Sequence, residues 1–182
     1  MLAARADLPR EQTFDEEGVL SAEYERLLAE NERYVEAFDR SGLGAEPLSG
    51  LAIIACMDAR LEVEAALGLQ TGDAHVIRNA GALATDDAIR SLIVSQQLLG
   101  TDEVLIIGHT NCGLEGVDEP GLRDRLASST GASLDLSFGG FPDVEASVRE
   151  QVERVRTHPW VRRVPVHGLV FEVETGRIRE VA

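Results

Sequence analysis

Short, unbroken apolar runs recur along this chain and predict buried strands. Leu51–Ala55 and Val104–Ile107 are the clearest of them. Continuous apolarity over this length is typical of a strand whose two faces are both covered by helices. His75–Gly81 predicts a further strand, which ends in a polar, glycine-containing loop. These runs indicate a mostly parallel sheet at the centre of the fold.

Between the predicted strands, apolar residues recur at the spacing of a helix. Thr85 is a favourable N-cap, and acidic residues follow it, where the positive end of the helix dipole stabilises them. Pro142-Asp143 opens another amphipathic pattern, which Pro159 ends. The predicted helices therefore span residues 61–67, 85–100, 122–129 and 143–158.

The C-terminal residues predict an antiparallel hairpin. Val164–Val173 and Arg177–Val181 both have strand character, and residues 174–176 provide a tight turn between them. Strands that alternate with helices and end in a hairpin predict an α/β fold: a mostly parallel central sheet flanked by helices, with a C-terminal antiparallel hairpin. A nucleotide-binding fold is disfavoured because the chain lacks both glycine-rich phosphate-binding motifs.

The first 45 residues predict an N-terminal helical arm. Residues 1–20 are polar, and from Ser21 to Phe38 apolar side chains fall on one side of a helix that Gly42 stops. Because this helix precedes the first strand, it needs a packing surface outside the sheet's own crossovers. That surface is either the parent domain or a partner subunit. We expect residues 1–182 to form a single domain, with no internal repeat or linker.

Composition and charge exclude several classes of partner for this protein. The chain has 182 residues and a formal net charge of −15, which argues against nucleic acid and against an anionic membrane as partners. It has no apolar stretch long enough to span a membrane and no secretory signal in its first residues. We therefore expect a cytoplasmic protein with reduced thiols. In that setting its 2 cysteines are better explained as metal ligands or reactive thiols than as a disulfide.

Both cysteines lie in polar clusters directly behind predicted strands. The first cluster is Cys56-Met57-Asp58-Ala59-Arg60, and the second is His109-Thr110-Asn111-Cys112-Gly113. Because ligands collect at the carboxyl ends of strands in open α/β sheets, we expect the two clusters to form one site. Cys56, His109 and Cys112 are three zinc-type ligands, and the sequence offers no nearby fourth Cys or His to close the site.

Asp58 and Arg60 extend this hypothesis. A carboxylate two residues from a ligand can reach the open position of the metal or hydrogen-bond a water there. A guanidinium two residues further can hold that carboxylate away through a bidentate, charge-assisted pair. The pair predicts a gate on the fourth position of the metal. The alternatives are a structural salt bridge for Asp58–Arg60 and small buried hydrophobes for the cysteines.

The two clusters resemble the beta class of carbonic anhydrases, which carry Cys-x-Asp-x-Arg and His-x-x-Cys at a comparable separation. The segments His75–Gly81 and Asp87–Leu92 are also similar to that family, particularly to its shorter prokaryotic members. The resemblance runs from Leu51 to Gly116 and resumes at Val166–Val181. The chain departs from the family at two positions. Relatives often have Asp or Gly where this chain has Asn111, and Gly where it has Ala82.

The resemblance implies that Cys56, His109 and Cys112 bind Zn²⁺. It also implies that Asp58 and Arg60 form a catalytic dyad, with Asp58 on the metal only in a closed form. The implied reaction is the reversible hydration of carbon dioxide to bicarbonate and a proton by a zinc-bound hydroxide. A homodimer or homotetramer is implied too, with the N-terminal helix lying on the partner.

Two other functions remain open. The same zinc site could hydrolyse carbon disulfide or carbonyl sulfide, because substrate choice depends on pocket shape and access route. A zinc- or bicarbonate-binding protein without turnover would carry the same ligands. The segment 114–140 has no motif that assigns it a role.

Overall fold

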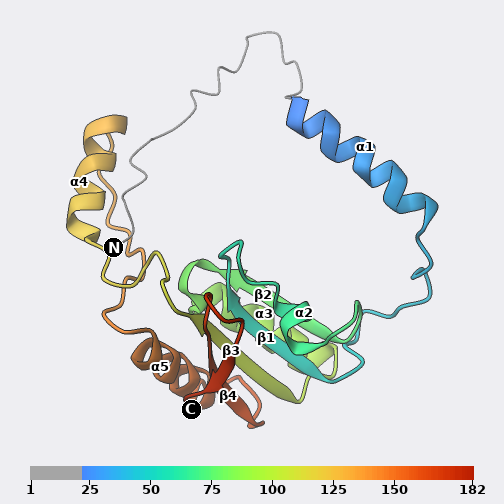
Figure 1. Cartoon of the computed structure of the whole chain (residues 1–182). Coiled ribbons are helices and arrows are strands. Elements are labelled where there is room, and N and C mark those ends of the chain that lie inside the picture. The colour runs from blue at the N-terminus through green and yellow to red at the C-terminus, as the bar shows by residue number, and fades with distance from the viewer. Residues whose placement is uncertain (1–21) are drawn as a thin grey trace. The chain divides into compact units, whose positions relative to one another are not determined.

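The computed structural model describes residues 22–182, which fall into two units divided between Leu43 and Gly44. Each unit is described by itself. The larger unit is built on a five-stranded sheet (Figure 1). Its strands are β1 (Leu51–Cys56), β2 (Ala74–Asn79), β3 (Glu103–His109), β4 (Val166–Phe171) and β5 (Ile178–Glu180).

The sheet has the strand order β2-β1-β3-β4-β5. The first four strands are parallel, and β5 pairs antiparallel with β4. This arrangement confirms the predicted α/β fold with its C-terminal antiparallel pair. β1 and β3 each extend further than the apolar runs predict, so that Cys56 and His109 are the last residues of their strands.

The helices of this unit begin and end close to the predicted positions. Thr85 caps its helix by accepting a hydrogen bond from the Ala88 backbone N–H, and Asp143 does the same for Ala146. The short helix at 63–67 starts two residues later than predicted. The helices are α2 (Val63–Leu67), a 3₁₀ turn η1 (Ala80–Ala82), α3 (Asp86–Leu98), α4 (Glu119–Thr130) and α5 (Val144–Thr157).

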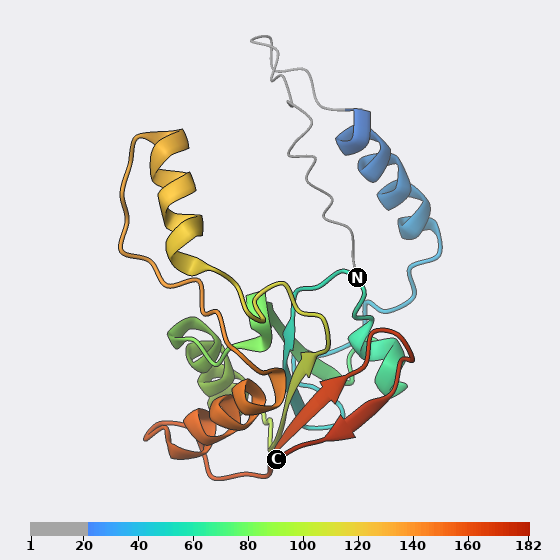
Figure 2. The same ribbon diagram turned by 60° about the vertical axis from the view of Figure 1, so that its left-hand side comes forward.

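Helices cover both faces of the sheet. Figure 2 shows α3 and α5 on one side and α2 on the other. The first side holds the larger core cluster, including Ile54, Leu92 and Ile106, all fully buried. The second side holds a smaller cluster that includes Cys56 and Cys112. The metal-ligand candidates are therefore set among apolar side chains at one end of the core.

Glycines in the sheet let α5 approach closely. A Cβ on Gly108 would lie 2.7 Å from Val148 Cγ2, and one on Gly168 would lie 2.8 Å from Val148 Cγ1. Both distances are shorter than carbon–carbon contact allows. Because Gly108 precedes His109, this contact fixes the end of β3 from which the histidine projects.

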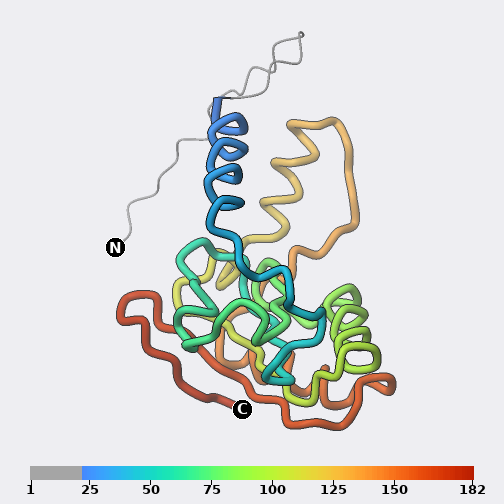
Figure 3. Tube along the Cα trace, turned by 90° about the vertical axis from the view of Figure 1, so that its right-hand side faces the viewer, coloured from blue at the N-terminus to red at the C-terminus, as the bar shows by residue number. Residues whose placement is uncertain are grey.

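α4 differs from the other helices of this unit. It has no buried residue, and Figure 3 shows it and the segment after it extending away from the sheet before the chain returns to α5. Glu119 binds the return segment by accepting hydrogen bonds from the Phe138 and Gly140 backbone N–H groups. The helix predicted at 122–129 is thus confirmed.

The smaller unit contains α1 (Ala22–Glu36), which confirms the predicted N-terminal helix; the proposed N-cap, Ser21, lies outside the described residues. No residue of α1 is buried. Leu27, Leu28 and Val35 expose 51%, 48% and 59% of their surface. None of the helices in the described part of the chain is long and apolar enough to cross a membrane.

Candidate metal centre

Cys56, His109 and Cys112 come together at the carboxyl edge of the sheet. β1 and β3 are neighbouring parallel strands, with Ala55 opposite Ile107, so their last residues meet at the same edge. The three ligand atoms all lie within 4.8 Å of one another. The three residues expose only 4%, 1% and 8% of their surface. Sequence reasoning thus identified three residues that the fold brings into one buried cluster.

The hydrogen bonds of His109 orient it as a ligand. Its Nδ1 lies 2.9 Å from the Thr110 carbonyl oxygen, which can only accept, so Nδ1 carries the proton. Nε2 is then a lone-pair acceptor, and it is buried without a hydrogen-bond partner in the described part of the chain. An unpartnered buried acceptor is unfavourable unless another group, such as a metal ion, satisfies it.

The donor set and its spacing fit zinc. Tetrahedral zinc with Zn–S near 2.3 Å and Zn–N near 2.0 Å places its ligand atoms about 3.5 to 3.8 Å apart. The ligand atoms of the cluster, all within 4.8 Å of one another, are therefore close enough together to surround the ion. Two sulfurs and one imidazole nitrogen are a normal zinc donor set, and three protein ligands leave one position open. Within residues 22–182, these three side chains are the His, Cys or acidic groups that lie close enough together to share one metal ion.

The two thiols differ in acidity. Burial would raise the pKa of Cys56, but the nearby His109 imidazole and hydrogen bonds from the backbone N–H groups of Asp58 and Gly81 outweigh it and lower the pKa to about 7. Burial also raises the pKa of Cys112, and there it prevails. Burial opposes a charged His109, yet its contact with Cys56 raises the imidazole pKa. Without metal, Cys56 is thus the thiol prepared to be a thiolate ligand.

Asp58 and Arg60 form the bidentate pair that their spacing predicts. Arg60 Nε donates to Oδ1 and Nη2 donates to Oδ2, each at 2.8 Å, and the Arg60 backbone N–H adds a bond of 2.9 Å to Oδ1. The guanidinium hydrogen bonds hold the pKa of Asp58 well below its usual range. Oδ2 also lies 3.7 Å from His109 Nε2, so the carboxylate stands beside the cluster.

Arg60 links the two polar clusters of the sequence. Besides holding Asp58, its Nη2 donates to the Asn111 carbonyl oxygen at 3.0 Å. Asn111 has a φ of 56°, in the left-handed region where asparagine is better tolerated than most residues. That turn carries the chain from His109 to Cys112. Asn111, a departure from the family pattern, therefore keeps the backbone shape that glycine would give.

Arg78 positions the first cluster. Its Nε and Nη2 donate to the Cys56 carbonyl oxygen at 3.0 and 2.8 Å, and Nη2 also donates to the Asp58 carbonyl oxygen at 2.7 Å. Asn79 shapes the next loop through hydrogen bonds to the N–H and carbonyl of Leu83. Only the three-dimensional pairing of β1 with β2 reveals which carbonyls Arg78 binds.

His75, His158 and His167 lie outside the metal cluster. His75 bonds to the Ser95 hydroxyl and the Ala45 carbonyl, His158 accepts from the Trp160 backbone N–H, and His167 contacts the carboxylates of Glu103 and Glu180. Asp87 and Arg90 form an ion pair of 2.9 Å at the start of α3. Ala82, the second departure from the family, is 1% exposed and has a φ of 57°.

Comparison with known proteins agrees with this site. A family model described as carbonic anhydrase matches residues 51–121. Beta-carbonic anhydrase 1 of Mycobacterium tuberculosis is 41% identical over 155 residues, which cover 85% of this chain and 94% of the relative. A carbon disulfide hydrolase of Acidithiobacillus thiooxidans is 40% identical over 150 residues, which cover 71% of this chain and 75% of the relative.

Solved structures give the same result. The carbonic anhydrase of Streptococcus mutans matches with a TM-score of 0.85 and 37% identity, over 90% of this chain and 100% of that one. The carbonic anhydrase of Glaciozyma antarctica matches with a TM-score of 0.82 and 40% identity, over 90% of this chain and 100% of that one. On this identity and coverage, the chain belongs to the beta-carbonic anhydrase family.

Proposed function

We propose that this protein catalyses the reversible hydration of carbon dioxide to bicarbonate and a proton, with zinc at Cys56, His109 and Cys112. One observation carries the proposal: the buried Cys/His/Cys cluster has an Arg60-bound carboxylate beside it, with Asp58 Oδ2 3.7 Å from His109 Nε2. Zinc bound there would supply the Lewis acid that activates a water molecule near neutral pH. Membership of the family supports the same reaction.

The protein's own side chains have separate roles in this proposal. His109 and the two cysteines hold the metal, and the Thr110 carbonyl fixes the imidazole tautomer that makes this possible. Asp58, ionised through its bond to Arg60, accepts a hydrogen bond from the reacting water and orients it. Arg60 holds the carboxylate in place, and with zinc bound this would keep Asp58 off the open coordination position. If the pair broke, Asp58 would be free to serve as a fourth ligand to the ion.

Hydrolysis of carbon disulfide is the second candidate. It is favoured by the relative from Acidithiobacillus thiooxidans, whose identity to this chain nearly equals that of the mycobacterial carbonic anhydrase. Both reactions add water to a small linear molecule, so the cluster itself does not separate them. The route by which a substrate reaches the site separates the two reactions, and carbonyl sulfide is expected to behave as carbon disulfide does.

A paired assay on the zinc-loaded protein tests the proposal. Stopped-flow measurement of carbon dioxide hydration is run beside measurement of hydrogen sulfide release from carbon disulfide and carbonyl sulfide. We expect rapid hydration of carbon dioxide that depends on bound zinc. Sulfide release without carbon dioxide hydration would establish the second candidate instead. No turnover of any of the three substrates would leave a zinc- or bicarbonate-binding protein.

The assembly is the other part of the proposal. We propose a homodimer or homotetramer in which residues 1–45 pack on a partner subunit while residues 1–182 form one functional domain. The unburied apolar side chains of α1 support a partner surface, because an isolated soluble helix rarely exposes such a stripe. Cytoplasmic location is proposed on the grounds that both cysteines are free thiols suited to bind metal.

A further inference from the structure

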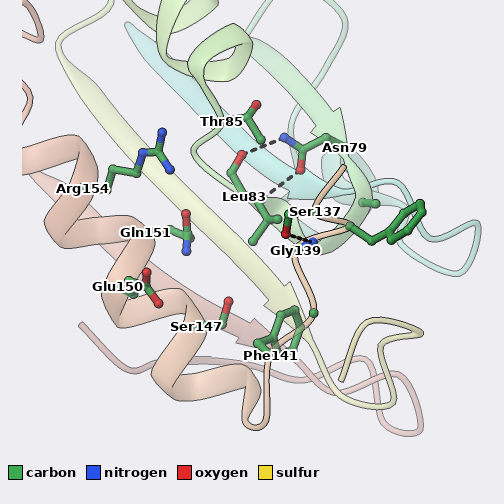
Figure 4. A pocket seen from close by; sticks show the side chains of 13 residues that line it. Asn79, Leu83, Thr85, Ser137, Gly139, Phe141, Ser147, Glu150, Gln151 and Arg154 are labelled. Atoms are coloured by element: carbon green, nitrogen blue, oxygen red, sulfur yellow. Dashed lines mark hydrogen bonds between the residues drawn. The ribbon is translucent and has the colours of Figure 1, made fainter. Parts of the chain in front are cut away.

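A cleft lies on the face of the sheet covered by α3 and α5. Its volume is about 550 Å³, within the range of small-molecule sites. Figure 4 shows it bounded by α5, by the loop around Leu83 and by the segment around Gly139. None of the three metal-ligand candidates lines it. The cleft is therefore separate from the metal centre.

Two buried polar side chains face this cleft with unused donors. Gln151 is 6% exposed, and its Oε1 accepts the Ala84 backbone N–H at 3.0 Å. Ser147 is 5% exposed and lies one helical turn away on α5, so the two side chains are neighbours. In the described part of the chain, neither the Gln151 amide nitrogen nor the Ser147 hydroxyl has a hydrogen-bond partner. Neither atom is among the fully buried polar atoms without a partner in the described part of the chain, so both are reachable from the cleft and can donate to a molecule held there.

The rim of the cleft adds an acceptor and charges of both signs. Glu150 lies on the same side of α5 and makes no ion pair within residues 22–182. Arg154, one turn further along the helix, instead pairs with Asp86 at 2.8 Å. Leu83 and Phe141 provide apolar walls. Because the three charged groups sum to −1 and the chain carries −15, a net negative ligand is disfavoured.

We propose that this cleft binds a small neutral molecule that carries a carboxamide or ureido group on an apolar body. The ligand's carbonyl oxygen accepts from the Gln151 amide and the Ser147 hydroxyl, and its N–H group donates to Glu150. The apolar body lies against Leu83 and Phe141. Both donors gain an acceptor in this arrangement, and no charge is transferred into the cleft.

The ligand would share a loop with the metal centre. Leu83 hydrogen-bonds the Asn79 side chain through both its N–H and its carbonyl. The Asn79 backbone carbonyl in turn accepts from the N–H of Met57, the residue after Cys56. The site stands independently of the proposed function, since its test measures binding and not turnover.

Benzamide is a suitable probe, with benzoate as its negatively charged counterpart of similar shape. The zinc-loaded, ¹⁵N-labelled full-length protein is titrated with each and followed by NMR. We expect saturable benzamide-dependent shifts at the amides of Leu83, Ser147 and Gln151, and weaker binding of benzoate. Failure of benzamide to saturate, or tighter binding of benzoate, would overturn the proposal and leave a solvent-filled cleft or an anion site.

Substitutions locate the binding. Gln151→Glu keeps an oxygen for the Ala84 N–H but removes the donor, and we expect about tenfold weaker benzamide binding from the lost hydrogen bond. Ser147→Ala is a milder second variant with a loss in the same direction, and Glu150→Ala removes the acceptor. Glu153→Ala, on the exposed side of α5, is the matched control. Unchanged affinity in both the Gln151 and Ser147 variants would refute the site.

Discussion

Arg60 holds both carboxylate oxygens of Asp58, with two side-chain hydrogen bonds of 2.8 Å each. Two parallel bonds fix the plane of the carboxylate as well as its position. The same guanidinium reaches the Asn111 carbonyl, in the turn before Cys112. The arrangement keeps an ionised acceptor beside the three metal-ligand candidates.

Asp58→Asn tests whether this acceptor contributes to turnover. Asparagine keeps the size of the side chain but loses the charge and part of the acceptor capacity. We expect kcat/KM for carbon dioxide hydration to fall by about 10²-fold or more, as for other positioned proton-accepting groups. Zinc content should stay unchanged. Glu62→Gln, on an exposed neighbour, is the control, and full activity in the Asp58 variant would reject the gate.

The Asp58–Arg60 pair also predicts how stability depends on pH. The folded-state pKa of Asp58 lies below its unfolded value, so the pair stabilises the fold fully above about pH 4, the ordinary aspartate range. As pH falls through the folded pKa, Asp58 is protonated and this contribution is lost. Denaturant unfolding of metal-free wild type and Asp58→Asn should give free energies that differ most at neutral pH. A difference that grows below pH 4 would contradict this sign.

Sequence reasoning was most successful where a local pattern determines the result. The apolar runs of β1 and β3, the cap Thr85 and the helix start at Pro142-Asp143 depend on neighbouring residues, and the structure confirms them. Cys56, His109 and Cys112 could be grouped because parallel strands end at one edge.

Long-range contacts were beyond the same reasoning. The bonds from Arg78 to the Cys56 and Asp58 carbonyls require the pairing of β1 with β2. The cleft at Gln151 requires α5 and the loop at Leu83 to meet, and these are far apart in sequence. Strand ends carry local signals, whereas a pocket wall is assembled from separate segments.

Ala82 offers a test of backbone strain near the metal centre. Its φ of 57° is unfavourable for alanine, so glycine would relieve roughly 1–2 kcal/mol of strain there. The same substitution also removes a buried methyl group and raises the entropy of the unfolded chain, and both of these effects lower stability. Ala84 is equally buried but is not among the described residues with positive φ. We therefore expect Ala84→Gly to lower the free energy of unfolding by about 1–2 kcal/mol more than Ala82→Gly does. Equal losses in urea unfolding would show that Ala82 is unstrained.

The apolar stripe of α1 predicts a measurable effect on assembly. Leu27→Glu places a charge on the stripe, and burying an unpaired charge at a subunit contact is strongly unfavourable. Light scattering after size exclusion should show a smaller particle than the wild type forms. Glu25→Gln, also on α1 but off the stripe, should leave the mass unchanged. An unaltered mass for the Leu27 variant would place the subunit contact elsewhere.

X-ray absorption at the zinc edge tests the central claim most directly. For the zinc-loaded protein at pH 8, we predict two sulfur ligands at about 2.3 Å, one imidazole nitrogen and one light-atom ligand from solvent. Cys112→Ser should remove one sulfur from this sphere, and Asp58→Asn should leave the sphere unchanged. A sphere closed by four protein ligands at pH 8, or one without two sulfurs, would contradict the account.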